Sequence, residues 1–335
     1  MKLKTVVFLL LLTCFSNVLF SQINSLQAGG ATLPYPFYAK LFQEYYKKTG
    51  VKINYQPIGS GSGIQQLRGN RIDFAGSELT VSEDYINTYF SGEIIQIPMY
   101  ATGIGVIFNL PEINTLKLDS TVIADIFLGN ITKWNDKKIQ KLNPDTKLPP
   151  LSITPIVRAE KSGTTSAFTH YLSRNSILWN KTIGNKSMIA SAITLSAKGI
   201  KGVVNLAEKI KGSITYAGLA YIDSSSLGIA SLLNNLNNFV YPSVEFVQKS
   251  VKNINSLANL KLNPQDSNKK NGYPIIAYTW ILIYKQQQTS TIQELISWMV
   301  TDGKKIAKDY KFIPLQSKIQ KQEISKINIT KLHHD

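Results

Sequence analysis

The chain has 335 residues, of which 43% are hydrophobic and 17% are charged. These fractions are typical of a folded globular protein and exclude an intrinsically disordered chain, while the length allows two domains. Lysine and arginine number 37 against 21 aspartates and glutamates, so the formal net charge is +16. A basic chain often binds nucleic acid, but no basic stripe here alternates with aromatic residues and no nucleic-acid motif occurs. We therefore expect no nucleic-acid partner.

The N-terminus has the pattern of a secretion signal. Two lysines precede the apolar run 6–12, and small or polar residues follow as far as Ser21. We interpret residues 1–21 as a signal peptide and expect an exported, periplasmic protein. Cys14 could instead be the lipid-anchored residue of a lipoprotein, but Thr13 is a poor fit to the small residue that such a site requires. No later stretch is long and apolar enough to span a membrane.

The first part of the chain alternates helical and extended patterns. A glycine-rich turn at 28–34 leads into a helical pattern with an aromatic face, which Gly50 closes. A second small-residue turn at 59–63 opens another helical pattern. Extended patterns are predicted at 51–55, 72–75, 94–98 and 103–109. This alternation predicts βαβ units with their loops collected at one edge of a sheet.

The rest of the chain continues in the same manner. Ser120 is the predicted N-cap of a helix over 121–128. Further helices are predicted at 137–142, 202–211 and 290–309, a strand pair at 212–222, and a strongly apolar strand at 274–284.

The stretch 158–166 is the most informative one. A β-branched run ends at Arg158, and a Ser-Gly-Thr turn at 162–164 then opens a helical pattern. Such a turn presents free N–H groups and the positive end of a helix dipole, which together bind anions. Arg158 adds a cation that can hold two oxygens of one ligand. For this stretch alone, an ordinary capped helix with a surface arginine is the better interpretation.

Three turns share this design, at 31–33, 59–63 and 162–164. The turn at 59–63 lacks the third glycine of a dinucleotide fingerprint, the Gly-Lys-Ser/Thr of a P-loop and the serine of a nucleophile elbow. Each turn taken singly indicates no more than helix capping. Together with Arg158 and with Glu78 at a strand end, they favour a site for a small tetrahedral oxyanion.

Five segments resemble successive motifs of the PstS family, the phosphate-binding proteins of high-affinity phosphate ABC transporters. The segments are Gly30-Ala31-Thr32-Leu33-Pro34, Tyr55-Gln56-Pro57-Ile58-Gly59-Ser60, Asp73-Phe74-Ala75-Gly76-Ser77-Glu78, Asp125-Ile126-Phe127-Leu128-Gly129 with Lys133-Trp134-Asn135, and Arg158 through Ser166. The resemblance implies an α/β periplasmic-binding-protein fold of type II, with two lobes, a two-strand hinge and a ligand cleft between them. It also implies inorganic phosphate as ligand, a membrane permease as partner, a monomer, and neither metal nor cofactor.

The resemblance assigns the phosphate ligands position by position. They are Thr32, Leu33, Ser60, Glu78, Arg158, Ser162, Gly163 and Thr164, with Glu160 behind them as the carboxylate that pairs with the arginine. Glu78 stands where the family has an aspartate that accepts the phosphate proton. Lys161 replaces a usual glycine, and Leu33 replaces a usual phenylalanine. Glu78 is one methylene longer than that aspartate, so proton-based selectivity requires its side chain to fold back to hydrogen-bonding distance of the ligand.

Three alternatives remain open at this point. An exported phosphatase would need metal ligands or an activated nucleophile, and the three histidines, His170, His333 and His334, are a poor set for either, so we expect no enzyme. A sulfate or molybdate protein is a closer rival, although a buried carboxylate would repel its unprotonated ligand. A surface or adhesin-like role on the same fold is the third.

We also expect discontinuous domains. The apolar run 274–284 should return to the N-terminal lobe, so that residues 22–102 and 278–335 form lobe I and residues 103–277 form lobe II.

Overall fold

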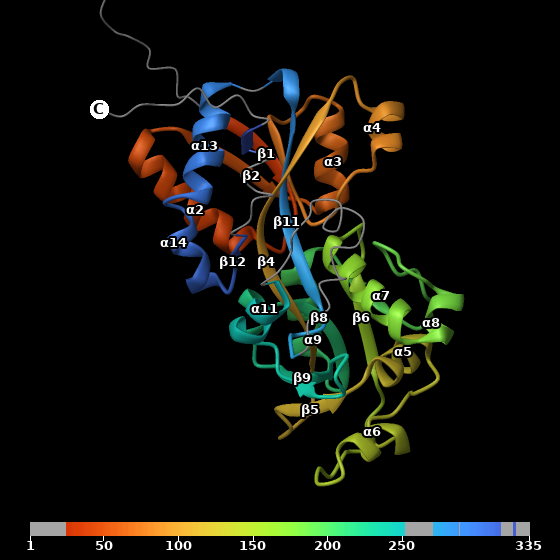
Figure 1. Cartoon of the computed structure of the whole chain (residues 1–335). Coiled ribbons are helices and arrows are strands. Elements are labelled where there is room, and N and C mark those ends of the chain that lie inside the picture. Colours follow the sequence, from red (N-terminus) through yellow and green to blue (C-terminus); the bar gives the residue numbers. More distant parts are fainter. Residues whose placement is uncertain (1–24, 252–270, 288, 316–323, 326–335) are drawn as a thin grey trace, which may run out of the picture.

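The computed structural model describes residues 25–251, 271–287, 289–315 and 324–325 (Figure 1). The expected signal peptide at 1–21, with Cys14, lies outside the described residues, and so do His333 and His334.

Strands and helices alternate along the described residues. The strands are β1 (Ser25–Gly30), β2 (Lys52–Pro57), β3 (Phe74–Ser77), β4 (Ile94–Phe108), β5 (Thr115–Leu118), β6 (Thr154–Arg158), β7 (Leu195–Ala197), β8 (Ser213–Gly218), β9 (Gly228–Leu233), β10 (Phe239–Val240), β11 (Ile276–Tyr284) and β12 (Ile313–Pro314). The α-helices are α2 (Tyr35–Thr49), α3 (Ser60–Arg68), α4 (Glu83–Tyr89), α5 (Ser120–Leu128), α6 (Lys137–Leu142), α7 (Gly163–Asn175), α8 (Ile177–Thr182), α9 (Gly199–Lys209), α10 (Leu219–Ile222), α11 (Val244–Val251), α13 (Ser290–Val300) and α14 (Lys304–Ala307). Two 3-10 turns, η1 (Lys285–Gln287) and η2 (Lys308–Tyr310), complete the set within these residues.

The described strands join in one hydrogen-bonded network of mixed direction. Its main path runs β2-β1-β3-β11-β4-β8-β6-β7, and β9, β5, β10 and β12 attach beside it. The strands β1, β2 and β3 are parallel to one another, and so are β8, β6 and β7. Between the two parallel sets, β11 and β4 pair antiparallel to their neighbours. The carboxyl ends of the two parallel sets are therefore where the connecting loops gather.

Two long strands run through the middle of this path. β4 pairs with β11 from Ile94 to Gly103 and then with β8 from Ile104 to Phe108. All fifteen residues of β4 are buried, because neighbours cover it along its whole length. Figure 1 shows β4 and β11 passing side by side from the upper group of elements to the lower one. The extended segments expected at 94–98 and 103–109 are thus a single strand.

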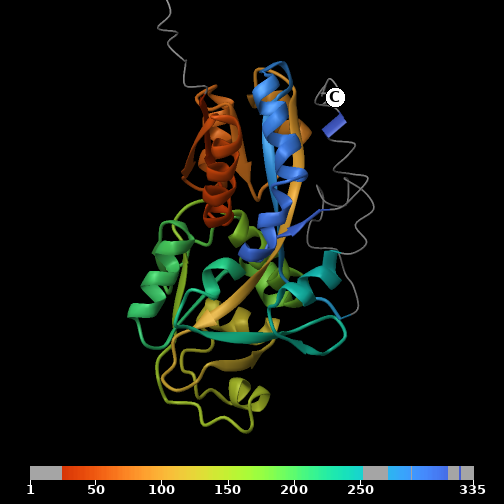
Figure 2. The ribbon, with the colours of Figure 1, turned by 90° about the vertical axis from the view of Figure 1, so that its left-hand side faces the viewer.

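The fold is the α/β periplasmic-binding-protein fold expected from the sequence. In Figures 1 and 2 an upper group, with β1–β3 and the helices α2, α3, α4, α13 and α14, lies above a lower group, with β5–β9 and the helices α5–α9 and α11. The C-terminal helices α13 and α14 pack against α2. The exact lobe boundaries, 22–102 with 278–335 and 103–277, stay a prediction.

The helix α2 forms as its sequence pattern predicts. Its aromatic and aliphatic residues at helical spacing are buried on one face, and Gly50 ends it in the left-handed conformation, with φ 72°. The large apolar side chains recur at the 3.6-residue spacing of a helix, which explains why this helix is correctly located.

Three expectations about the remaining elements are wrong. The segment 212–222 is strand β8 followed by α10, because Leu219 and Ile222 stand at helical rather than strand spacing and both are buried. The cap of α5 is Asp119, whose carboxylate accepts the N–H of Val122 at 2.8 Å, and not Ser120. The helix expected over 290–309 breaks after Val300, where Thr301 leaves helical geometry with φ −103° and ψ −85°. Gly303 then passes so close to α2 that a Cβ there would lie 2.7 Å from Leu41 Cδ1.

Strand β1 carries no sequence signal and was not expected. It consists mostly of small residues, because α3 packs directly on its end: a Cβ on Gly63 would lie 2.5 Å from the Cα of Gly30. Gly30 itself has φ 135°, and a Cβ there would lie 2.0 Å from the carbonyl oxygen of Gly76. The small residues of β1 therefore serve to let the backbones of α3 and β3 approach the strand closely, rather than to supply apolar surface.

A pair of glycine substitutions tests this interpretation. Gly30→Ala meets both a disfavoured φ and a backbone clash, so we expect it to lower the free energy of unfolding by at least ~3 kcal/mol. Gly50→Ala also places a side chain at a positive φ, here the milder left-handed value of 72°, but no atom lies within 4 Å of its Cβ, so we expect a loss of only about 1 kcal/mol. Urea unfolding of the two variants measures both values, and equal losses would contradict the crowding argument.

Candidate anion-binding site

Four turns that each precede a helix meet at the boundary between the upper and lower groups. They are the turns before α2, α3, α7 and α9. The N–H of Gly61 points to the carbonyl oxygen of Lys161 at 3.5 Å, which joins the second turn to the third. A Cβ on Gly199 would lie 3.8 Å from Thr32 Cγ2, which places the fourth turn beside the first. The structure thus brings together the three turns singled out in the sequence and adds one at Gly199.

Arg158 stands at the end of β6 and is only 2% exposed. Its Nε donates to Glu160 Oε1 at 3.0 Å, its Nη2 also bonds Glu160, and its Nη1 donates to Ser162 Oγ at 3.0 Å. Glu160 in turn accepts the backbone N–H of Gly199 at 3.1 and 3.3 Å. The guanidinium is therefore held in one orientation by partners on both sides, as a bidentate site requires.

Glu78 follows β3 and is buried in the upper group, facing the start of α7. Its Oε2 accepts the hydroxyl of Thr164 at 2.5 Å, and its N–H donates to Ser60 Oγ at 3.1 Å. Burial raises the pKa of Glu78 above its ordinary value, while the hydrogen bond from Thr164, the charge of Arg158 and the N–H of Leu33 oppose that rise. The extra methylene does not prevent the carboxylate from reaching the other group.

Close backbone approach is built into this boundary. A Cβ on Gly163 would lie 2.1 Å from Glu78 Cβ, and one on Gly61 would lie 2.8 Å from Lys161 Cβ. A Cβ on Gly218 would lie 2.1 Å from Leu33 Cδ1. The two groups can meet in this way only because one partner in each pair has no side chain.

The remaining predicted site residues also lie here, and all are buried. Ser60 begins α3, Ser162 caps α7 by accepting the N–H of Thr165 at 3.4 Å, and Thr32 and Leu33 precede α2. Thr32 Oγ1 is buried without a hydrogen-bond partner in the described part of the chain. A buried hydroxyl in that state costs free energy, and a polar ligand placed beside it would remove the cost.

The positive potential at this site comes mainly from the N-terminal ends of helix dipoles rather than from charged side chains. The site contains one arginine and the two carboxylates of Glu78 and Glu160, so its side chains alone do not attract an anion. Each helix start contributes roughly half a positive charge, and α3, α7 and α9 are nine residues or longer. Oriented N–H groups, hydroxyls and one guanidinium can therefore hold a small oxyanion, with Glu78 as an acceptor for a ligand hydroxyl.

Sequence reasoning missed two contributors to the site. Gly199 supplies the N–H that binds Glu160, and Tyr221 donates its hydroxyl to the carbonyl oxygen of Thr32 at 2.7 Å. The glycine at 199 is a weak turn signal that could have been noticed. Nothing local marks Tyr221, because its partner lies in the other group.

The described residues offer neither a metal site nor a membrane span. No cluster of three or more His, Cys, Asp or Glu side chains there has the arrangement of a metal site. Within the same residues, no helix has the length and apolarity needed to cross a membrane.

Comparisons with known proteins identify the family of the chain. The profile of the PBP superfamily domain matches residues 21–303. The phosphate-binding protein PstS of Pasteurella multocida is 35% identical over 320 residues, which cover 93% of this chain and 92% of that protein. PstS of Haemophilus influenzae is 33% identical over 308 residues, covering 90% and 91%.

Among solved structures, a periplasmic phosphate-binding protein (PfluDING) bound with phosphate matches with a TM-score of 0.70. The match covers 90% of this chain and 92% of that one at 21% identity, so it supports the fold alone. The family match and the identity to full-length relatives lead to one conclusion: the chain belongs to the PBP superfamily and, within it, to the PstS family of phosphate-binding proteins.

Proposed function

We propose that the protein is an exported substrate-binding protein that captures inorganic phosphate and delivers it to the permease of an ABC transporter. Its relatives named as phosphate-binding proteins span almost the whole chain, which supports this assignment. The periplasm as its location, a monomeric state and the permease as its partner belong to the same proposal.

The proposal rests mainly on one observation: a hydrogen-bond acceptor, the carboxylate of Glu78, lies beside several hydrogen-bond donors of the other group. Glu78 lies across the boundary from Arg158, Ser162 and the start of α7, and it is held by Thr164. Phosphate near neutral pH carries a P–OH hydrogen and several bare oxygens. A ligand of that kind needs one acceptor and many donors.

We assign the ligand contacts on this basis. Thr32 would donate its free hydroxyl, Leu33 its N–H, Ser60 its hydroxyl and N–H, and Arg158 its guanidinium. At the start of α7, Gly163 and Thr164 would donate their N–H groups and Ser162 its hydroxyl, because the N–H of Ser162 already bonds the carbonyl oxygen of Ser187 at 2.8 Å. Glu160 would hold Arg158 in place without touching the ligand.

The ligand would be released unchanged, so we propose no enzymatic activity. His170, the histidine within the described residues, lies on α7 with its Nδ1 3.2 Å from Asn185 Nδ2. The PstS relatives are named for binding rather than for a reaction. Metal-independent release of phosphate from a model ester would contradict this part of the proposal.

A different tetrahedral oxyanion is the second candidate, because dipoles and N–H groups would also hold sulfate. The buried carboxylate of Glu78 argues against it, since sulfate has no hydrogen to offer. A surface or adhesin-like role on this fold would still use the same phosphate site.

Arg158→Ala should reduce phosphate affinity by at least about 100-fold, because it leaves the ligand and Glu160 without their buried cation. Isothermal titration of phosphate-stripped protein measures the change. Arg174→Ala is the matched control, because Arg174 is exposed near the end of the same helix and should leave the affinity within a factor of two. A small effect of Arg158→Ala would contradict the assignment.

Glu78→Gln tests selectivity. In the wild type, we expect phosphate and arsenate to bind and sulfate to be weaker by several orders of magnitude, because two unmatched negative groups would be buried together. The amide of the variant can turn its NH₂ toward sulfate, so the ratio of phosphate affinity to sulfate affinity should be smaller in the variant than in the wild type. Calorimetric titration with the three anions measures it. Comparable wild-type affinities for sulfate and phosphate would refute the role of Glu78, and so would unchanged discrimination in the variant.

Gly163→Ala tests whether the two groups must meet to hold the ligand. The new Cβ collides with Glu78 Cβ, so we expect phosphate to bind about 10- to 100-fold more weakly while the ligand-free melting temperature hardly changes. Gly202→Ala adds the same methyl group within α9, where its nearest neighbour is at an ordinary 3.5 Å, and should bind normally. A large drop in the ligand-free melting temperature of Gly163→Ala would instead indicate a packing defect inside one group.

A further inference from the structure

One hydrogen bond at the boundary lies outside the set of ligand contacts proposed above. Tyr221, on the short helix after β8, donates its hydroxyl to the carbonyl oxygen of Thr32 at 2.7 Å. Thr32 precedes α2 in the upper group, whereas Tyr221 belongs to the lower one. The bond therefore forms only when the two groups are in contact as they are here.

The carbonyl group that Tyr221 contacts belongs to the peptide between Thr32 and Leu33. The N–H at the other end of that peptide is the one that faces the carboxylate of Glu78, and it is among the proposed phosphate donors. A hydrogen bond to the C=O of a peptide fixes the orientation of its plane and polarises its N–H. Tyr221 thus acts on the ligand site through one rigid peptide unit.

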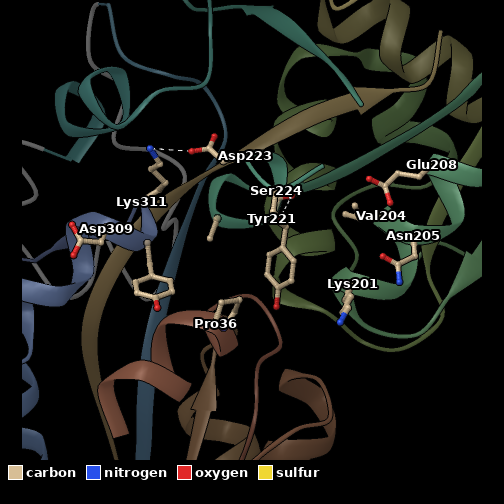
Figure 3. Close-up of a pocket in the computed structure, with 12 residues that line it drawn as sticks. Pro36, Lys201, Val204, Asn205, Glu208, Tyr221, Asp223, Ser224, Asp309 and Lys311 are labelled. Carbon is tan, nitrogen blue, oxygen red and sulfur yellow. Dashed lines mark hydrogen bonds and ion pairs between the residues drawn. The ribbon is translucent and has the colours of Figure 1, made fainter. Parts of the chain in front are cut away.

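The surroundings of Tyr221 keep its hydroxyl available as a donor. Burial raises the pKa of Tyr221, and the nearby charge of Glu78 raises it further. One side of the ring lines a cavity of about 480 Å³ between the two groups, together with Pro36, Lys201 and Asp223 (Figure 3). Because that side of the ring is open, loss of the hydroxyl should not disturb a packed core.

A second contact crosses the same cavity and serves as a comparison. Lys311 Nζ lies 2.9 Å from Asp223 Oδ2, and both side chains are well exposed, at 39% and 54%. An exposed ion pair of this kind contributes little to stability. It connects the groups without touching any peptide of the ligand site.

We propose that Tyr221 is a positioning residue for phosphate, which locks the Thr32–Leu33 peptide in its ligand-binding orientation once the two groups close. The inference rests on the proposed function. In this proposal the hydroxyl of Tyr221 lowers the dissociation rate of phosphate that is already enclosed between the two groups. Because the bond forms after encounter, its loss should act on dissociation rather than on association.

The test compares Tyr221→Phe with the wild type and with Asp223→Asn, each stripped of phosphate. Stopped-flow mixing with inorganic phosphate should give a dissociation rate about 10-fold faster for Tyr221→Phe, an association rate within a factor of two, and an unchanged ligand-free melting temperature. Asp223→Asn should match the wild type in all three quantities at physiological salt.

The possible results separate the two levels of inference. A wild type that fails to bind phosphate overturns the proposed function and this proposal with it. If the wild type binds, unchanged dissociation in Tyr221→Phe overturns the positioning role alone. A fall in its ligand-free melting temperature matching the loss of affinity does the same, because it indicates an ordinary packing contact. An equal effect of Asp223→Asn would show that any link between the groups suffices, which also refutes the proposal.

Discussion

A buried guanidinium is the constraint on which the arrangement of the site depends. An unpaired charge removed from water costs several kcal/mol, so the buried guanidinium of Arg158 needs partners within the protein. Glu160 and Ser162 supply the partners, and Glu160 is satisfied in turn by the N–H of Gly199. The end of β6, the start of α7 and the start of α9 are thereby tied to one charged group. Their positions follow from its hydrogen bonds rather than from apolar packing alone.

The contact between the two groups follows a different principle, in which space rather than charge is decisive. Glycines at 30, 63, 163 and 218 allow backbone and side chains to approach to distances that any Cβ would forbid. The same positions bring the N–H groups of helix starts toward one point. A ligand enclosed there is held by many oriented dipoles and a single cation, in surroundings of low polarity where such interactions are strong. This arrangement favours ligands by their pattern of donors and acceptors rather than by charge alone.

Much of this could be predicted from the sequence, and what could not has a physical cause. Helix α2 was located because its apolar residues recur at helical spacing, and strand β11 because it is a long continuous apolar run. The turns at 31–33, 59–63 and 162–164 were located because small residues precede helices. The family resemblance named the candidate ligands, which the structure brings together. Strand β1 was missed because small residues give no period. Tyr221 and Gly199 were missed because their roles depend on contacts across the boundary, which no local pattern records.

The order of strands also has a consequence for how the chain folds during synthesis. β3 lies between β1 and β11, so one edge of the first parallel set stays open until Ile276–Tyr284 is available. Most of the chain must therefore leave the ribosome before its earliest strands are fully paired. Contacts of such large sequence separation form slowly, and an open strand edge is prone to pair with other chains in the meantime. In a newly made molecule, the unpaired edge of β3 is therefore a place where another chain can add until Ile276–Tyr284 covers it.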